Sequence, residues 1–191
     1  PRGPLRDPVQ ARIAQHHQLV APVVIAPRGD KEIKAVRERK RFLLHFLRKA
    51  GIKRFDPFQP VRRQAAEAMS KRKIGAIIAI ERKTHLREWT EDATQVNAPL
   101  TREMLQTIFY PGGPMHDGGV VVKDTTIVAA RCVFPLSQTE LGRGTRHRAA
   151  LGLSERTDAA IVVVSEETGS IAVACEGHFF KDLTRETLIR L

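Results

Sequence analysis

Two runs of the sequence contain only apolar residues and glycine, and they limit what this chain can fold into more than any other feature. Residues 74–80 read Ile-Gly-Ala-Ile-Ile-Ala-Ile, and residues 159–164 read Ala-Ala-Ile-Val-Val-Val. Strands that are apolar at every position are typical of a sheet that is covered on both faces. The sequence therefore predicts an α/β (α+β) fold, a single globular domain in which helices flank a central β-sheet.

The rest of the pattern predicts the other elements of this domain. We expect helices at 61–72, 101–110, 146–155 and 182–191, and further strands at 120–123, 127–134 and 171–175. Thr101 and Thr145 are the expected N-caps of the second and third helices. Residues 84–98 are polar and irregular, with Trp89 as an anchor, and residues 135–144 form a loop. Because hairpins and helices are interspersed, we expect a mixed sheet rather than a purely parallel one.

The formal net charge of +11 is concentrated in the first third of the chain. Residues 1–63 hold 16 Lys and Arg against 5 Asp and Glu, whereas residues 64–191 hold 16 of each kind. We therefore divide the chain into a basic N-terminal arm and linker (1–60), which is extended or disordered with a helix at 31–50, and a compact domain (61–191). A basic arm suits an anionic membrane surface or an acidic partner, and it equally suits a solvated segment.

Several classes of protein are disfavoured by composition. A nucleic-acid binder would carry its basic patch on the folded domain and would use aromatic side chains for stacking, but only 5% of the residues are aromatic. No signal peptide and no apolar run of about eighteen residues is present. Cys132 and Cys175 lie in apolar runs, so we expect buried free thiols. Because the sequence begins at Pro1 rather than Met, we expect a fragment of a longer protein.

Residues 116–119, His-Asp-Gly-Gly, form the first of three loops that carry chemistry. The two glycines allow the backbone to come close to a bulky ligand. A carboxylate and an imidazole beside them can bind a metal or handle a proton. Taken alone, the motif is weak evidence, because such a segment is more often an ordinary Asp-Gly turn.

The second loop, 144–148, reads Gly-Thr-Arg-His-Arg and opens a predicted helix. Free backbone N–H groups at a helix start favour an anion. Arg146 and Arg148 add donors that suit phosphate, although they cannot share one helix face. The alternative is a solvated basic turn, but positive charge opposes the helix dipole there, so we expect something anionic nearby.

The third loop, 165–169, reads Ser-Glu-Glu-Thr-Gly and follows the second buried strand. Its acidic residues can supply a metal ligand, or the segment can be a polar hairpin turn. Together, the three loops contain what nucleotidyl transfer with a divalent ion requires: phosphate donors, a carboxylate beside glycines, and a metal-binding acid.

These stretches occur in the same order as in a known family. Residues 116–119, 133–137 (Val-Phe-Pro-Leu-Ser), 144–150 (Gly-Thr-Arg-His-Arg-Ala-Ala) and 165–169 resemble the diadenylate cyclase domain, most closely the membrane-associated bacterial type. The resemblance runs from about residue 62 to the C-terminus. It implies that two ATP condense to cyclic di-AMP and two pyrophosphates, and it makes residues 61–191 the catalytic domain.

The resemblance also implies the roles of individual residues. Asp117 would assist attack by the ribose 3′-hydroxyl on the α-phosphate, and Arg146 and Arg148 would complete the catalytic set. His116 and Glu167 would bind Mn or Mg. The implied ATP-binding residues are Gly118, Gly119, Phe134, Pro135, Gly144, Thr145, His147 and Ser165. His147 is either a ligand or a structural residue of the helix start.

Two positions depart from the family pattern. Gly119 stands where the family usually has Ala, which loosens the loop, and Val133 stands where membrane-type members often have Tyr, which reduces stacking on adenine. A catalytically weak module that binds or senses ATP or cyclic di-AMP remains the alternative function. Because each 3′-hydroxyl must attack the other ATP, catalysis requires two sites face to face, and we expect a homodimer as the active form. The membrane-associated type further implies an N-terminal membrane anchor and a cytoplasmic catalytic domain.

Overall fold

The computed structural model describes residues 60–139 and 144–183. Residues 1–59 of the predicted arm and linker, with the helix at 31–50, lie outside these ranges, whereas Pro60 is described and begins a helix. Residues 140–143 of the predicted loop and residues 184–191 of the predicted last helix also lie outside these ranges. The division of the chain near residue 60 into an arm and a compact domain therefore stays a prediction.

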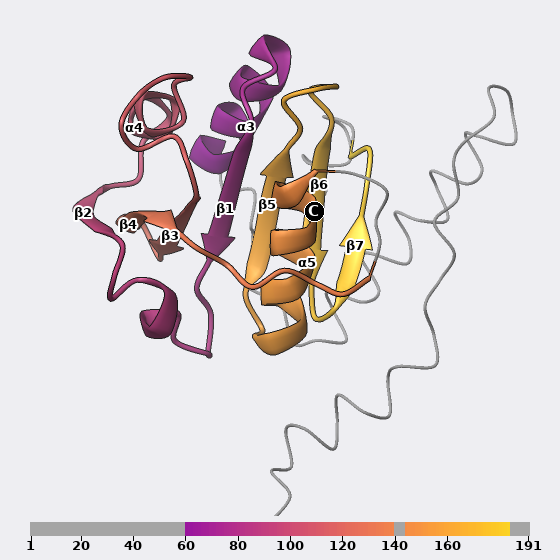
Figure 1. Ribbon diagram of the computed structural model, residues 1–191. Coiled ribbons are helices and arrows are strands. Elements are labelled where there is room, and N and C mark those ends of the chain that lie inside the picture. Colours follow the sequence, from indigo (N-terminus) through magenta and orange to yellow (C-terminus); the bar gives the residue numbers. More distant parts are fainter. Residues whose placement is uncertain (1–59, 140–143, 184–191) are drawn as a thin grey trace, which may run out of the picture.

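Seven strands form one sheet in the described part of the chain, in the order β2-β4-β3-β1-β5-β6-β7 (Figure 1). Their bounds are β1 Ala76–Ile80, β2 Thr94–Pro99, β3 Gly119–Lys123, β4 Thr126–Cys132, β5 Ala160–Val164, β6 Ile171–Cys175 and β7 His178–Phe180. β1 and β3 run parallel, and the other neighbouring strands are antiparallel. The predicted mixed sheet is confirmed.

Helices cover both faces of this sheet, as the apolar strands required. α3 (Pro60–Arg72) and α4 (Arg102–Ile108) pack on one face, and α5 (Thr145–Arg156) packs on the other, where Figure 1 shows it in front of β5 and β6. Alternate strand residues enter the two cores: Ile78, Ile80, Val120 and Val162 face α3 and α4, whereas Ile77, Ala79, Val121 and Ile161 face α5. The predicted fold class is confirmed for the described residues.

Strand directions bring the starts of β1, β3 and β6 and the ends of β4 and β5 to one end of the sheet. Ala76 at the start of β1 pairs with Val164 at the end of β5, and Gly119 at the start of β3 pairs with Cys132 at the end of β4. Because β1 and β3 are parallel, their starts lie side by side. We call this end of the sheet the site end, since the loops at 116–118, 133–139 and 165–169 adjoin it.

The structure corrects several sequence predictions. The segment 84–98 is not irregular throughout, since β2 occupies its last part, and the short β7 was not expected at all. Thr101 caps α4 as predicted, because its side chain accepts a hydrogen bond from the backbone N–H of Met104. Thr145 is not the N-cap of α5; it is the first helical residue, and Gly144 precedes the helix without a side-chain cap.

Further boundaries differ by one or two residues. α4 ends at Ile108 rather than Tyr110. β4 ends at Cys132, so Phe134 lies in the loop that follows. Trp89 is half-buried and packs on the core beneath α5, while Leu86 beside it is completely buried and anchors this segment more firmly.

The opposite end of the sheet is fixed by a largely buried carboxylate. Glu81 follows β1, and its oxygens accept from the backbone N–H of Leu86 at 2.9 Å, from Lys123 Nζ at 3.1 Å and from His85 Nδ1 at 3.1 Å. Burial raises the pKa of Glu81, but these hydrogen bonds and the charge of Lys123 outweigh burial, and the net pKa is lowered.

Glu81→Gln should therefore lower the free energy of unfolding at neutral pH by about 1–2 kcal/mol, because the charge-assisted hydrogen bonds are lost. A carboxyl whose pKa is lower in the folded state contributes stability above its unfolded pKa and loses it as pH falls through the folded value. The difference between wild type and variant should thus shrink below about pH 4.3. Urea titrations at several pH values measure this difference in the free energy of unfolding, and Glu88→Gln, at an exposed residue, is the control. If the difference in unfolding free energy between wild type and Glu81→Gln does not change with pH, the ionised Glu81 carboxylate does not stabilise the fold.

Candidate active site

Polar residues from separate parts of the chain meet at the site end. Arg146, in the first turn of α5, forms an ion pair with Glu166 in the turn after β5, with Nη1 2.6 Å from Oε2. Both side chains lie over Gly75, the residue before β1, where an added Cβ would be 2.8 Å from Glu166 Oε2 and 2.9 Å from Arg146 Nη1. The start of α5 and the turn after β5 are therefore held together over the start of β1.

The loop that carries Asp117 is fixed by the glycine that follows it. Gly118 has a φ of +95°, which disfavours any side chain. An added Cβ would lie 2.9 Å from the Cα and carbonyl carbon of Arg131, which itself has a φ of 59° at an irregularity in the pairing of β3 and β4. Two backbones thus pack directly together, and they hold the exposed Asp117 at the start of β3.

Gly119 makes room for the ring of Phe134. An added Cβ at Gly119 would lie 2.8 Å from Phe134 Cζ and still closer to Cε2. Phe134 is only 6% exposed and packs in the core beneath α5. The ring therefore occupies the space that an alanine methyl would need, and it couples the loop at 116–118 to the loop at 133–139.

Gly144 and Thr145 of the second loop are exposed, whereas His147 and Arg148 contact other parts of the structure. His147 is buried, and its ring lies against that of Phe179 in β7, with centroids 5.7 Å apart. Arg148 donates from Nε and Nη2 to the carbonyl oxygen of Ser137, at 3.3 and 3.1 Å. Arg146 and Arg148 thus face different parts of the structure, as their spacing on a helix requires.

The third loop contains one buried hydroxyl and two exposed acids. Ser165 is buried, and its Oγ accepts from the backbone N–H of Thr168 at 3.3 Å. Glu166 pairs with Arg146, whereas Glu167 is exposed and forms no ion pair with another described residue. The adjacent acids therefore have different surroundings.

Comparison with known proteins identifies the family. The family model described as "DisA bacterial checkpoint controller nucleotide-binding" (DAC) matches residues 63–179. The chain belongs to this family. It is similar to the protein named cyclic di-AMP synthase CdaA of Bacillus subtilis, with 44% identity over 65% of this chain and 47% of that protein. It is also similar to the diadenylate cyclase CdaS of Bacillus thuringiensis, with 50% identity over 61% of this chain and 59% of that protein.

The chain is also similar to two solved structures. The crystal structure of a double mutant of DacA from Staphylococcus aureus is 40% identical with a TM-score of 0.63, and the match covers 65% of this chain and 85% of that one. A structure described as a hypothetical membrane spanning protein from Bacillus cereus is 33% identical with a TM-score of 0.68, over 91% and 86% of the two chains. The chain spans about half the length of the curated relatives it matches.

Most residues expected from the DAC resemblance lie at or next to the site end. Asp117, Gly118 and Gly119 are at the start of β3, Ser165 and Glu167 are after β5, and Thr145 and Arg146 begin α5. Sequence reasoning assigned no individual role to Gly75 or Ser137, and it offered Glu166 only as one of two adjacent acids that could bind a metal. Glu166 was visible only as the neighbour of Glu167, and nothing in the sequence indicated which acid meets Arg146.

The residues proposed to hold a metal fit such a role in part. Nδ1 of His116 lies 2.6 Å from the carbonyl oxygen of Gly113. When Nδ1 carries the proton and donates it to that carbonyl, the lone pair of Nε2 is available for a metal. Among residues 60–139 and 144–183, no group of three or more His, Cys, Asp or Glu side chains is arranged to hold an ion. Substrate phosphates, water or a second copy of the chain would have to complete the coordination.

The cysteines do not contribute a nucleophile. Cys132, at the end of β4, and Cys175 are both buried and free, as predicted. Burial raises the pKa of the Cys132 thiol to about 11 and that of Cys175 to about 12. Both thiols stay protonated near neutral pH and are therefore unreactive.

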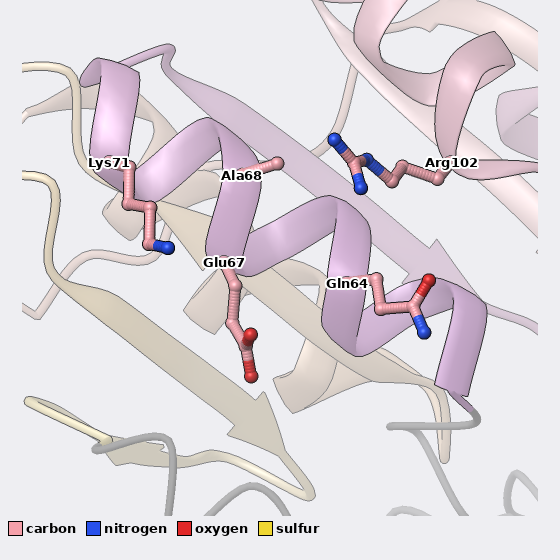
Figure 2. Close-up of a pocket in the computed structure, with 5 residues that line it drawn as sticks. All are labelled: Gln64, Glu67, Ala68, Lys71 and Arg102. Atoms are coloured by element: carbon pink, nitrogen blue, oxygen red, sulfur yellow. The ribbon is translucent and has the colours of Figure 1, made fainter.

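A small pocket of about 170 Å³ is lined by residues of α3 and by Arg102 at the start of α4 (Figure 2). Its lining residues are Gln64, Glu67, Ala68, Lys71 and Arg102. None of the residues expected from the family resemblance lines it, so we place the candidate site at the site end instead.

Gly119→Ala should destabilise the protein by about 1–3 kcal/mol, because the new methyl overlaps a buried ring that has no free space. Combining it with Phe134→Leu, which removes the ring, should cost less than the sum of the two single changes. Thermal and urea unfolding of the four proteins measure this coupling. Gly144→Ala is the control, since a Cβ there meets nothing within 4 Å. If the losses of stability from Gly119→Ala and Phe134→Leu simply add, the ring of Phe134 does not occupy the space beside Gly119 in solution.

Proposed function

We propose that this chain condenses two ATP into cyclic di-AMP and two pyrophosphates. The observation that carries the proposal is the gathering of Asp117, Arg146 and Ser165 at one end of the sheet. Family membership and relatives that are 40–50% identical and named cyclic di-AMP synthase or diadenylate cyclase support it.

The reaction consists of two equivalent phosphoryl transfers. In each, the 3′-oxygen of one ATP forms a bond to the α-phosphorus of the other, and the bond from that phosphorus to the bridging oxygen of the β-phosphate breaks. The 3′-hydroxyl loses its proton, and pyrophosphate leaves. Two such transfers close the ring, so the two nucleotides must face each other in line.

Asp117 is the proposed base or contact for the 3′-hydroxyl. It is exposed, and the packing of Gly118 against β4 holds its backbone in place. A carboxylate held in this way can accept the proton without first having to order a flexible loop. Its exposure also leaves it accessible to a nucleotide that is bound to a second copy of the chain.

Arg146 and Ser165 are the proposed phosphate ligands. Arg146 is only partly exposed and already holds a carboxylate at 2.6 Å, so its guanidinium is oriented for an anion. Ser165 Oγ accepts from the backbone of Thr168, which leaves its own proton to donate. Backbone N–H groups at Gly144 and Thr145, where α5 starts, add donors for the same charge.

We propose that Phe134 and Pro135 border the adenine. The buried ring of Phe134 holds its own backbone beside Gly119, and that backbone would contact the base. Val133 is 82% exposed, so it offers only a small apolar surface to the base. His147 is buried against Phe179, so its contribution to ATP binding would be to support the start of α5.

Mn or Mg is the proposed cofactor, held by His116 through Nε2 and by Glu167. When bound, a divalent ion neutralises charge on the phosphates. The active form is proposed to be a dimer in which two site ends face each other. Within the described residues, no helix is long and apolar enough to cross a membrane. The N-terminal membrane anchor of a longer protein thus stays a prediction from the resemblance.

Asp117→Asn should reduce formation of cyclic di-AMP by about 10²–10⁴-fold, since the amide cannot accept the proton. ATP affinity should change little, because Asp117 does not contact phosphate in this proposal. Product is measured by chromatography after incubation with ATP and Mn, and ATP affinity by calorimetry without metal.

The control is Asp92→Asn, an exposed acid in the polar segment before β2, which should leave turnover unchanged. Wild-type activity in Asp117→Asn would show that another group takes the proton. If the wild type binds ATP but forms no cyclic di-AMP under conditions where it dimerises, the chain is a nucleotide-binding or sensing module instead.

A further inference from the structure

Arg148 does not reach toward Glu166 and the start of β1 as Arg146 does. Its Nε and Nη2 both donate to one acceptor, the carbonyl oxygen of Ser137 in the loop after β4. In return, the backbone N–H of Ser137 donates to the carbonyl oxygen of Arg148 at 3.1 Å. Ser137 and Arg148 are therefore joined through both the side chain and the backbone.

A second residue of α5 holds the same serine. Ser137 is only 2% exposed, and its hydroxyl donates to Glu155 Oε1 at 2.7 Å. The same hydroxyl oxygen accepts from the backbone N–H of Thr139 at 3.1 Å. All the polar groups of Ser137 are thus engaged, although the residue lies in a loop without regular structure.

Between these two contacts, the loop lies directly on the helix. An added Cβ at Gly152 would be 2.6 Å from the backbone nitrogen of Ser137 and 2.8 Å from the carbonyl carbon of Leu136. Arg148, Gly152 and Glu155 are spaced i, i+4 and i+7, so they share one face of α5. Figure 1 shows the segment after β4 crossing in front of α5. We call these three residues and Ser137 the loop clamp.

We propose that the loop clamp positions the base-binding loop, and that Arg148, Glu155 and Ser137 are positioning residues rather than phosphate ligands. This inference rests on the proposed function, because it assigns adenine to Phe134 and Pro135. Phe134 and Pro135 lie three and two positions before Ser137. A shift of Ser137 would therefore also displace the backbone of these two residues. Arg146 binds phosphate and Arg148 holds the loop, so the two arginines of one motif have separate tasks.

The proposal separates recognition of the base from recognition of the phosphates. The ligands to compare are ATP and inorganic triphosphate, titrated by calorimetry without metal so that no turnover occurs. Arg148→Ala, Ser137→Ala and Glu155→Ala should each weaken ATP binding about tenfold, equal to about 1.4 kcal/mol, and leave triphosphate affinity within about twofold. Arg146→Ala should weaken the binding of both ligands. Glu155→Gln keeps an acceptor for the Ser137 hydroxyl and should largely restore ATP affinity.

The matched control is Arg156→Ala, an exposed arginine at the end of the same helix. It should change neither affinity. If Arg148→Ala weakens triphosphate binding as strongly as ATP binding, Arg148 binds phosphate directly and the inference is wrong. Arg148→Lys, which keeps a donor, replaces the alanine variant if that one does not fold.

Hydrogen exchange tests the clamp independently of any nucleotide. In the Arg148, Ser137 and Glu155 alanine variants, peptides that cover residues 133–139 should exchange faster than in wild type, while peptides from β5 should not change. If residues 133–139 exchange at the wild-type rate in all three variants, the inference is wrong, whether or not the protein makes cyclic di-AMP. If the variants exchange faster but the wild type lacks cyclase activity, the clamp stands and only the proposed function is lost.

Discussion

The burial of the central sheet on both faces is the constraint on which the rest of the structure depends. β1 and β5 are buried at every residue, with α3 and α4 on one side and α5 on the other. No polar side chain can lie on these strands without being removed from water. The chemistry of the molecule must therefore lie at the strand ends, and the antiparallel pairing of β1 with β5 brings two of those ends together.

The same constraint explains which parts of the fold could be predicted from the sequence. A strand that is apolar throughout stands out, and β1 and β5 were predicted for that reason. β2 is mostly exposed and polar, with the sequence Thr-Gln-Val-Asn-Ala-Pro, and its register shifts partway along its pairing with β4. It is an edge strand held by backbone hydrogen bonds, which leave little trace in composition. β7 has three residues, too few for any periodicity.

For the candidate site, the sequence identified the loops but not the partners within them. Motif order predicted that Asp117, Arg146 and Ser165 belong together, and the helical spacing predicted that Arg146 and Arg148 face apart. It could not predict that Arg148 would meet the carbonyl of Ser137, because that contact depends on the path of a loop backbone. A glycine in a helix, such as Gly152, has low helix propensity and gives no sign of what lies against it.

The pairing of Arg146 with Glu166 resolves an electrostatic conflict that was visible in the sequence. Two arginines in the first turn of α5 oppose the helix dipole, and no acid in that turn offsets them. Glu166, in the turn after β5, supplies the missing negative charge. In the proposed function, a bound phosphate would have to replace or share that carboxylate. Under that proposal the carboxylate of Glu166 and the phosphate would compete for the guanidinium of Arg146. Glu166 would then limit how tightly the triphosphate is held, and it keeps Arg146 ordered when no phosphate is bound.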